Sequence, residues 1–231
     1  MCHGFRVGRT FRFSIACLVL VFSVFIVPTT KGATITVPAG GNIQSAINAA
    51  QPGDRIILEA NQDYTCFGPC VLPVKSGTAF ITIESSRYAE IPVRDFFSKQ
   101  PTPEVSQLMA RVKSLYSTEP VFQTAQGAHH YKLLGLDLMP SSGQATRIVE
   151  FGTTGSAQDT LAEVPHDLVI DKSWIHAAPT QEVQRCVALN SQSTDITNSW
   201  ISECHGRGYD TQAIACWNGP GPFKILNFCN L

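Results

Sequence analysis

Residues 35–60 read ITVPAGGNIQSAINAAQPGDRIILEA, and this stretch decides the fold. Asn42 can cap a helix, because its side chain can accept a hydrogen bond from the first backbone amides. The apolar residues after it recur at helical spacing: Ile43, Ala46, Ile47 and Ala50. Pro52-Gly53-Asp54 then ends the helix, because proline cannot continue it, and Arg55–Glu59 reads as a buried strand. The stretch therefore predicts a short strand, a helix of about two turns, a turn and a second strand.

This unit resembles the N-terminal cap of right-handed parallel β-helices, the pectin-lyase-like fold. The resemblance implies that the helix covers the open end of a solenoid and that the strand after the turn begins its coils. The alternative is one strand-helix-strand unit of an ordinary α/β domain. We favour the cap, because nothing further along the chain alternates strands with long helices.

The chain becomes repetitive from Val121 onward. The tripeptide Ser-Trp-Ile occurs at residues 173–175 and again at 199–201, a separation of 26 residues. Val187 and Ile214 lie in a second pair of similar segments, 27 residues apart. Repeats of this length with no helix in them are typical of a β-solenoid. We therefore predict an all-β protein, a right-handed parallel β-helix over residues 34–231 with a short N-terminal capping α-helix.

Residues 85–120 interrupt this pattern with an irregular stretch and a second helix signal. Thr102 can cap that helix with Pro103 at its first position, and its apolar stripe would be Val105, Leu108, Met109 and Val112. We expect an excursion that packs against the side of the solenoid. A lid that covers a substrate is the alternative.

Polar and aromatic residues recur at matching places in the repeat. Asp171, Asn198 and Asn227 fall at the corners of successive coils, where polar side chains can stack and satisfy backbone groups. Trp174 and Trp200 are expected one above the other. They could form an exposed platform for sugar rings, but a buried or half-buried aromatic stack is favoured.

Residues 1–33 have the layout of a secretory signal peptide. Three arginines precede an apolar run from residue 13 to residue 27, and small or polar residues follow it. The run is short for a membrane span, so an uncleaved N-terminal anchor is the less favoured alternative. We expect cleavage after Gly32 or Ala33, export to the periplasm, cell surface or medium, and no membrane association afterwards.

The charge balance does not indicate a nucleic-acid partner. Only 15% of residues are charged, and 17 basic against 18 acidic residues leave a net charge of −1. Binding of nucleic acid needs a clustered basic face, which this composition does not suggest.

Six cysteines remain after removal of the leader, and export makes disulfides possible. Cys66 and Cys70 enclose a Phe-Gly-Pro turn and are the best disulfide candidate. Metal binding is the alternative, but no second pair at zinc spacing accompanies them. We expect the other four to be scattered buried thiols: Cys186, Cys204, Cys216 and Cys229.

Three further segments carry a wider resemblance. They are residues 126–136, 164–171 and 210–225, the last with the specific run WNGPGPFKI. Together with the N-terminal unit they resemble a family of exported bacterial right-handed parallel β-helix repeat proteins, over nearly all of residues 34–227. The resemblance implies the fold and export, but no settled activity.

The densest group of ionisable residues is the Gly-rich turn 203–210, ECHGRGYD. We take as candidate catalytic residues its three members His205, Arg207 and Asp210, with Asp171 and Arg185 from the coil before. A structural role for the turn is the alternative. A uronate lyase needs a base and cations, usually Ca²⁺ on aspartates or arginine, and a hydrolase needs two carboxylates. No complete motif of either enzyme is present.

The remaining histidines give weaker signals. His129 and His130 precede a strand, and neighbours on a strand point to opposite faces, so we predict a structural role rather than a shared metal. His166 follows Pro165 in a turn and can be read either way. The metal content is left open, with Ca²⁺ as the ion expected for a lyase.

Two classes of function follow from these observations. The first is a secreted enzyme that binds and cleaves a polysaccharide, with an acidic one favoured. The second is a non-catalytic surface or carbohydrate-binding solenoid, or an inactive fragment. Outward Asp, Arg and His on adjacent coils would favour the first class, and outward Ser, Thr and Asn alone would favour the second.

The last residues start another coil without closing it. A solenoid needs a cap at both ends, because an open coil exposes apolar residues and an unpaired strand edge. Residues 223–227 begin the repeated pattern again, and the sequence stops four residues later. We therefore expect a C-terminally truncated chain with an open end and with Ile225 and Leu226 at an exposed edge.

Overall fold

The computed structural model describes residues 32–95, 98–116, 118–141 and 143–227. The predicted signal peptide lies outside them except for its last two residues, and so does Cys229. Within the described ranges, no helix has both the length and the apolar character needed to cross a membrane.

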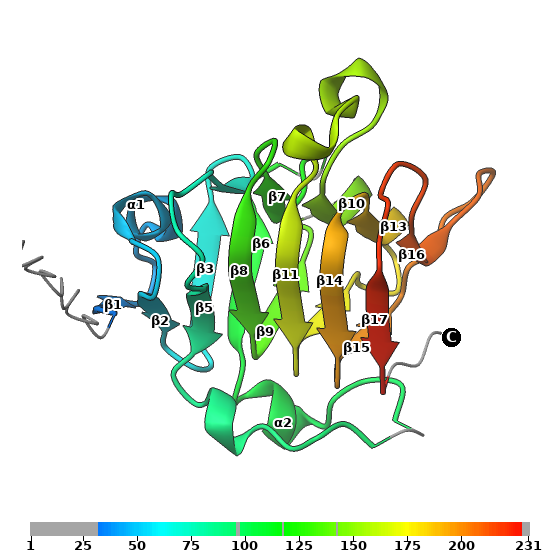
Figure 1. Cartoon of the computed structure of the whole chain (residues 1–231). Coiled ribbons are helices and arrows are strands. Elements are labelled where there is room, and N and C mark those ends of the chain that lie inside the picture. The colour runs from blue at the N-terminus through cyan, green and yellow to red at the C-terminus, as the bar shows by residue number, and fades with distance from the viewer. Residues whose placement is uncertain (1–31, 96–97, 117, 142, 228–231) are drawn as a thin grey trace, which may run out of the picture. The chain divides into compact units, whose positions relative to one another are not determined.

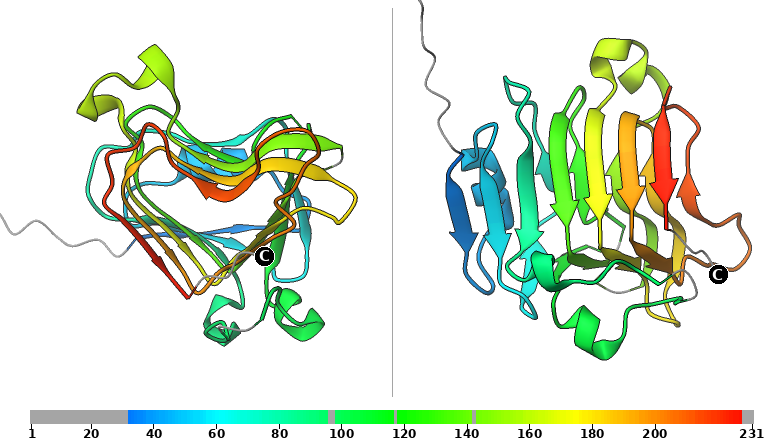
Figure 2. Two further views of the ribbon diagram at one scale, coloured as in Figure 1. Left: turned by 90° about the vertical axis from the view of Figure 1, so that its right-hand side faces the viewer. Right: turned by 60° about the horizontal axis from the view of Figure 1, so that its bottom comes forward.

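Three parallel sheets surround the core (Figures 1 and 2). The seven-stranded sheet has the order β1 (Thr34–Val37), β2 (Arg55–Leu58), β5 (Ile81–Ser85), β8 (His129–Leu134), β11 (His166–Asp171), β14 (Gln192–Thr197) and β17 (Phe223–Leu226). One five-stranded sheet holds β3 (Asp63–Cys66), β6 (Ala110–Ser114), β9 (Leu136–Met139), β12 (Trp174–His176) and β15 (Trp200–Ser202). The other holds β4 (Cys70–Leu72), β7 (Phe122–Thr124), β10 (Gln144–Phe151), β13 (Glu182–Leu189) and β16 (Gln212–Ala215).

From β2 onward, consecutive strands pass from one sheet to the next in constant rotation. The left view of Figure 2 looks along the stack and shows the three sheets around a shared interior. Alternate side chains of each strand enter that interior, such as Ile81 and Ile83 of β5 or Leu168 and Ile170 of β11. A mostly β chain in this order is compatible with a parallel β-helix solenoid.

The pairing confirms the repeat read from the sequence. Trp174 lies opposite Trp200, and Val187 lies opposite Ile214, each pair on neighbouring parallel strands. Trp200 is buried, while the half-buried Trp174 stacks on His176 with ring centroids 3.5 Å apart. The two indoles therefore match the buried or half-buried interpretation and not the exposed platform.

The expected corner ladder is confirmed for Asn198 and Asn227, but Asp171 lies opposite Thr197, one position before the corner. The Asn227 amide donates to the Asn198 side-chain oxygen at 2.8 Å, and the Asn198 amide donates to Asp171 Oδ1 at 2.8 Å. Asn198 and Asn227 have φ of 49° and 50°, a left-handed backbone that asparagine tolerates. Stacked amides thus hold the same tight bend in successive coils.

Helices are short and few within the described residues. They are α1 (Ile43–Ala49), α2 (Pro103–Ser106) and the 3₁₀ turns η1 (Tyr88–Glu90), η2 (Gly155–Gln158) and η3 (Leu161–Glu163). Asn42 Oδ1 accepts from the Ser45 backbone amide at 2.9 Å, as its capping position predicts. The buried face of α1 contributes Ile43, Ala46 and Ile47 to the core, beside β1, β3 and β4.

The excursion is shorter than residues 85–120. Thr102 does cap a helix with Pro103 at its start, but that helix is one turn and ends at Ser106. Residues 110–114 are strand β6, and Val112 faces the main core instead of a helix stripe. The described residues between Ser85 and Ala110 leave the sheets, and Met109 packs there with Ile91 and Trp200.

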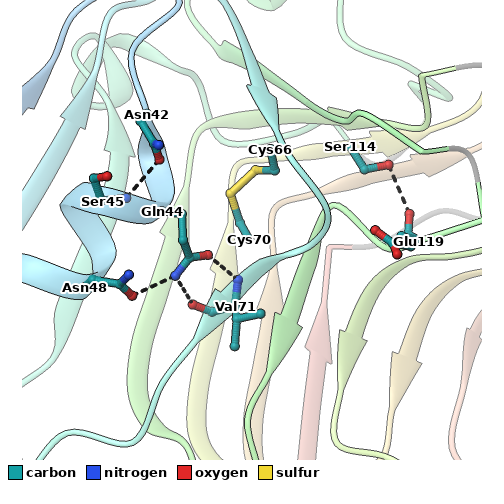
Figure 3. The surroundings of a disulfide bond; sticks show 9 residues. All are labelled: Asn42, Gln44, Ser45, Asn48, Cys66, Cys70, Val71, Ser114 and Glu119. Atoms are coloured by element: carbon teal, nitrogen blue, oxygen red, sulfur yellow. Dashed lines mark hydrogen bonds between the residues drawn. A yellow bond between two sulfur atoms is a disulfide. The ribbon is translucent and has the colours of Figure 1, made fainter.

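Two disulfides lie in the described residues. Cys66 and Cys70 form the predicted bridge near α1, where the Gln44 side chain also binds the backbone of Val71 (Figure 3). The expectation of scattered buried thiols is wrong for Cys186 and Cys204, which form a second bridge. They meet because the Val183 amide donates to the His205 carbonyl at 2.8 Å, which lays the loop after β15 along β13.

Cys216 also departs from the expectation, because it is a free cysteine at an exposed position. It follows β16, the edge strand of its sheet, where no further described strand covers it.

Candidate functional site

The candidate catalytic residues predicted from the sequence lie on different parts of the fold. His205, Arg207 and Asp210 are exposed in the loop between β15 and β16. Asp171 ends β11 in the seven-stranded sheet, and Arg185 lies on β13 of another sheet. Among the described residues, no hydrogen bond or ion pair joins Asp171 or Arg185 to the three residues of the loop.

Asp171 has a structural set of partners. Its Oδ2 accepts from the Tyr88 hydroxyl at 2.6 Å, and its Oδ1 accepts from the Thr197 hydroxyl and the Asn198 amide. With both oxygens occupied at a coil corner, this carboxylate is part of the ladder that links neighbouring coils.

The other predicted residues have local partners. His205 Nδ1 lies 3.5 Å from Glu203 Oε2. Asp210 accepts a hydrogen bond from the side chain of Gln212, two residues along the chain. The Arg185 guanidinium lies 4.9 Å from the centre of the Trp217 ring, in an open groove of about 430 Å³. This loop and this groove do not assemble the acid, base and cation that were expected of one site.

The structure instead brings together a histidine–aspartate cluster, defined by His129, His130, His166 and Asp167. These residues begin β8 and β11, which are neighbours in the seven-stranded sheet, and His129 lies opposite His166. The His129 and His166 rings are stacked with centroids 4.9 Å apart. The cluster is therefore a product of coil stacking.

A left-handed backbone aligns the cluster. His130 and Asp167 have φ of 60° and 53°, and Ser193 at the equivalent place in β14 has φ of 47°. Side chains of successive strand residues alternate only when the backbone is extended. The premise that His129 and His130 point to opposite faces is therefore wrong, because their Nδ1 atoms lie 2.7 Å apart.

Polar contacts connect all four side chains. Asp167 Oδ2 lies 2.7 Å from His166 Nδ1 and 3.7 Å from His130 Nε2. The edge of the His130 ring also contacts Phe80, with ring centroids 5.2 Å apart. His130 keeps 15% of its side-chain surface exposed, against 36% for His166 and 40% for Asp167. Of these three side chains, the Asp167 carboxylate is thus the most accessible.

Burial also sets the electrostatics of the cluster. Loss of solvent lowers the pKa of His129, the neighbouring His166 and His130 lower it further, and Asp167 acts in the opposite direction. The His129 imidazole is therefore biased toward its neutral form near pH 7, in which one ring nitrogen accepts a hydrogen bond.

A shallow groove adjoins the cluster on the same face. It has a volume of about 310 Å³, and Asp167 lies on its wall with Phe80, Val169, Ser193, Asp195 and Lys224 among the other lining residues. Within the described ranges, the side chains of Asp195 and Lys224 make no hydrogen bond or ion pair, so both charges are available to a ligand. Lys132 lies in the same row of the sheet and is held over the Phe80 ring at 4.5 Å.

Comparison with family models, with curated proteins and with solved structures finds no match to this chain. The chemistry of the site therefore rests on its own groups. An imidazole next to a carboxylate can move protons near neutral pH, and imidazole with carboxylate can also bind a metal ion.

Proposed function

We propose that this protein binds an extended acidic polysaccharide along the outer face of the seven-stranded sheet. One observation carries the proposal: the groove of about 310 Å³ beside the histidine–aspartate cluster presents unpaired Asp195 and Lys224 on adjacent strands. The lysine can bind sugar carboxylates, and the aspartate can accept hydrogen bonds from sugar hydroxyls.

The ladder of parallel strands suits such a ligand. Strands repeat about every 4.8 Å, which is close to the length of one sugar residue in an extended chain. The row of Lys132, Val169, Asp195 and Lys224 lies across four neighbouring strands. A polysaccharide that runs across the strands would meet one side chain of this row for each sugar.

The outward cluster favours the enzymatic class over a solenoid that only binds. Cleavage of a uronate by elimination needs a base for the proton beside the carboxylate. The His166 and Asp167 pair, with 2.7 Å between Nδ1 and Oδ2, is the group on this face that supports such a role. If this cleavage required Ca²⁺, the ion expected for a lyase would take part in the same reaction.

We also propose the finer description of the fold, a right-handed parallel β-helix of the pectin-lyase type with α1 over its N-terminal end. The three-sheet rotation supports it, together with the apolar face that α1 buries against the first strands. Export of the protein is proposed as well, because the two disulfides among the described residues suit an oxidising compartment.

Titration calorimetry with oligogalacturonate and with a neutral gluco-oligosaccharide tests the proposal. We expect binding of the acidic ligand, weakened about tenfold by Lys224→Gln because one charge-assisted contact is lost. The matched control is Arg207→Gln, which removes an exposed cation of the loop between β15 and β16, outside the lining of the groove, and should leave the affinity unchanged.

Three outcomes separate the interpretations. Absence of binding to any acidic glycan rejects the proposal. Weaker binding in Arg207→Gln but not in Lys224→Gln moves the site to the Gly-rich turn. The same mixtures are followed by the absorbance of unsaturated products, with and without Ca²⁺, and we expect cleavage. Binding without such products places the protein in the non-catalytic class.

A further inference from the structure

We propose that His130, His166 and Asp167 form a binding site for one divalent transition metal ion, with Zn²⁺ as the best fit. The inference goes beyond polysaccharide binding and does not depend on it. It is an alternative to the role of His166 and Asp167 as the base for cleavage, because an atom that binds the metal ion cannot take up a proton. The three side chains each offer one ligand atom, and these atoms all lie within 4.8 Å of one another.

The distances match a site that closes on an ion by small side-chain rotations. Zinc bonds of about 2.0–2.1 Å in a tetrahedron place the ligand atoms about 3.3 Å apart. Asp167 Oδ2 is 2.7 Å from His166 Nδ1 and 3.7 Å from His130 Nε2, which lie on either side of that value. The third pair of ligand atoms, one from each imidazole, lies within 4.8 Å.

The neighbouring histidine orients one ligand. His129 Nδ1 lies 2.7 Å from His130 Nδ1, so His130 can donate from Nδ1 and leave its Nε2 lone pair free toward Asp167. A hydrogen bond on the second ring nitrogen is the usual way in which a metal-binding histidine is held in one tautomer. The stacking of His129 on His166 also restricts the second imidazole ring.

The donor set determines the class of ion. Two imidazoles and one carboxylate suit zinc and similar transition metals, whereas Ca²⁺ and Mg²⁺ prefer oxygen ligands. Three protein ligands leave a fourth position for water or a ligand, as in catalytic zinc sites. Asp167 is 40% exposed and lines the groove, so that fourth position would face the groove.

The test is a titration of the chelator-treated full chain with Zn²⁺ alone at about pH 7, where unperturbed histidines are mostly neutral. We expect one equivalent to bind more tightly than Ca²⁺ or Mg²⁺, and Co²⁺ to give the visible absorption of a tetrahedral site. Asp167→Asn and His130→Asn remove a ligand but keep a residue that tolerates the left-handed backbone. Each should weaken Zn²⁺ binding at least about tenfold, because even outer partners of a metal ligand contribute that much.

The matched control is His205→Asn, a histidine-to-asparagine change on the exposed loop, which should bind Zn²⁺ as the unmodified protein does. A measurement without variants covers the case in which a variant does not fold. In the unmodified protein, Zn²⁺ should protect His130 and His166 from diethyl pyrocarbonate. Equal labelling with and without Zn²⁺, or binding that survives both ligand substitutions unchanged, overturns the site.

Discussion

Single residues in the left-handed region of the backbone decide which side chains meet on the outer face. His130, Asp167 and Ser193 repeat this conformation in three successive strands of the same sheet. Few non-glycine residues adopt it, although aspartate tolerates it better than most. Each such residue interrupts the alternation of its strand, and neighbours in sequence can then lie on one face. This local change creates the histidine–aspartate cluster.

Glu150 on β10 offers a test at the scale of one residue. Burial raises its pKa, and the nearby Arg147 guanidinium at 3.2 Å opposes the rise only in part. Because the folded pKa lies above the unfolded value of about 4.5, the folded state binds the proton more strongly. The native protein therefore loses stability as the pH rises through the unfolded pKa toward the folded one.

Glu150→Gln should remove this pH-dependent loss. We expect the difference in free energy of unfolding, variant minus unmodified protein, to be larger at about pH 7 than at about pH 4. Urea unfolding at both pH values measures it. Glu59→Gln, at an exposed glutamate, is the control. A difference between variant and parent that stays constant with pH would contradict the prediction.

At the scale of elements, helix α1 and helix α2 show where sequence signals are strong and where they fail. In α1 the cap, the apolar spacing and the Pro-Gly turn agree, and the helix forms where they place it. In α2 the cap is correct, but the apolar stripe after Ser106 belongs to a loop and to strand β6. Pairing of β6 with β3 and β9 holds Val112 in a strand, and this pairing overrides the local helical period.

The burial of α1 leads to a prediction about stability. Ile47 is fully buried in the main core, and Ile47→Ala should lower the free energy of unfolding by about 2–5 kcal/mol through lost burial and a cavity. Ser45→Ala on the exposed side of the same helix should change it by less than about 0.5 kcal/mol. Equal effects of the two substitutions in denaturant unfolding would show that the helix is not packed on the core.

At the scale of the whole molecule, residues 86–109 connect several coils of the stack. The described part of this segment makes contacts with residues far along the chain: Tyr88 with Asp171, Ile91 with Lys172, Ser98 with Trp200 and Arg94 with Asn227. Figure 1 shows the segment along one margin of the strands, with α2 in it. The observed contacts make it a brace across successive coils.

Tyr88→Phe tests this brace. Burial and then the hydrogen bond to Asp171 raise the pKa of Tyr88, so its hydroxyl stays protonated and donates. Loss of that hydrogen bond to a carboxylate should lower the stability by about 1–2 kcal/mol in thermal or denaturant unfolding. Tyr116→Phe, at an exposed tyrosine, is the matched control. A stable Tyr88→Phe variant that loses glycan binding would instead return Asp171 to the functional site.

Much of the architecture could be read from local patterns. The positions of α1, the repeat around Trp174 and Trp200, the corner ladder and the Cys66–Cys70 bridge all depend on residues close in sequence or on one constant spacing. The site could not be read in the same way. His129 and His166 are aligned by a coil of different length, so the spacing of the Ser-Trp-Ile repeat does not reveal their contact.

The sequence by itself determined a β-rich repeat with parallel pairing, because period, turn residues and caps are local properties of the chain. Only the tertiary structure decided which ionisable groups meet. The Cys186–Cys204 bridge and the histidine–aspartate cluster both join residues from different strands or coils. Their contacts depend on strand register and, for the cluster, on a left-handed backbone at His130 and Asp167.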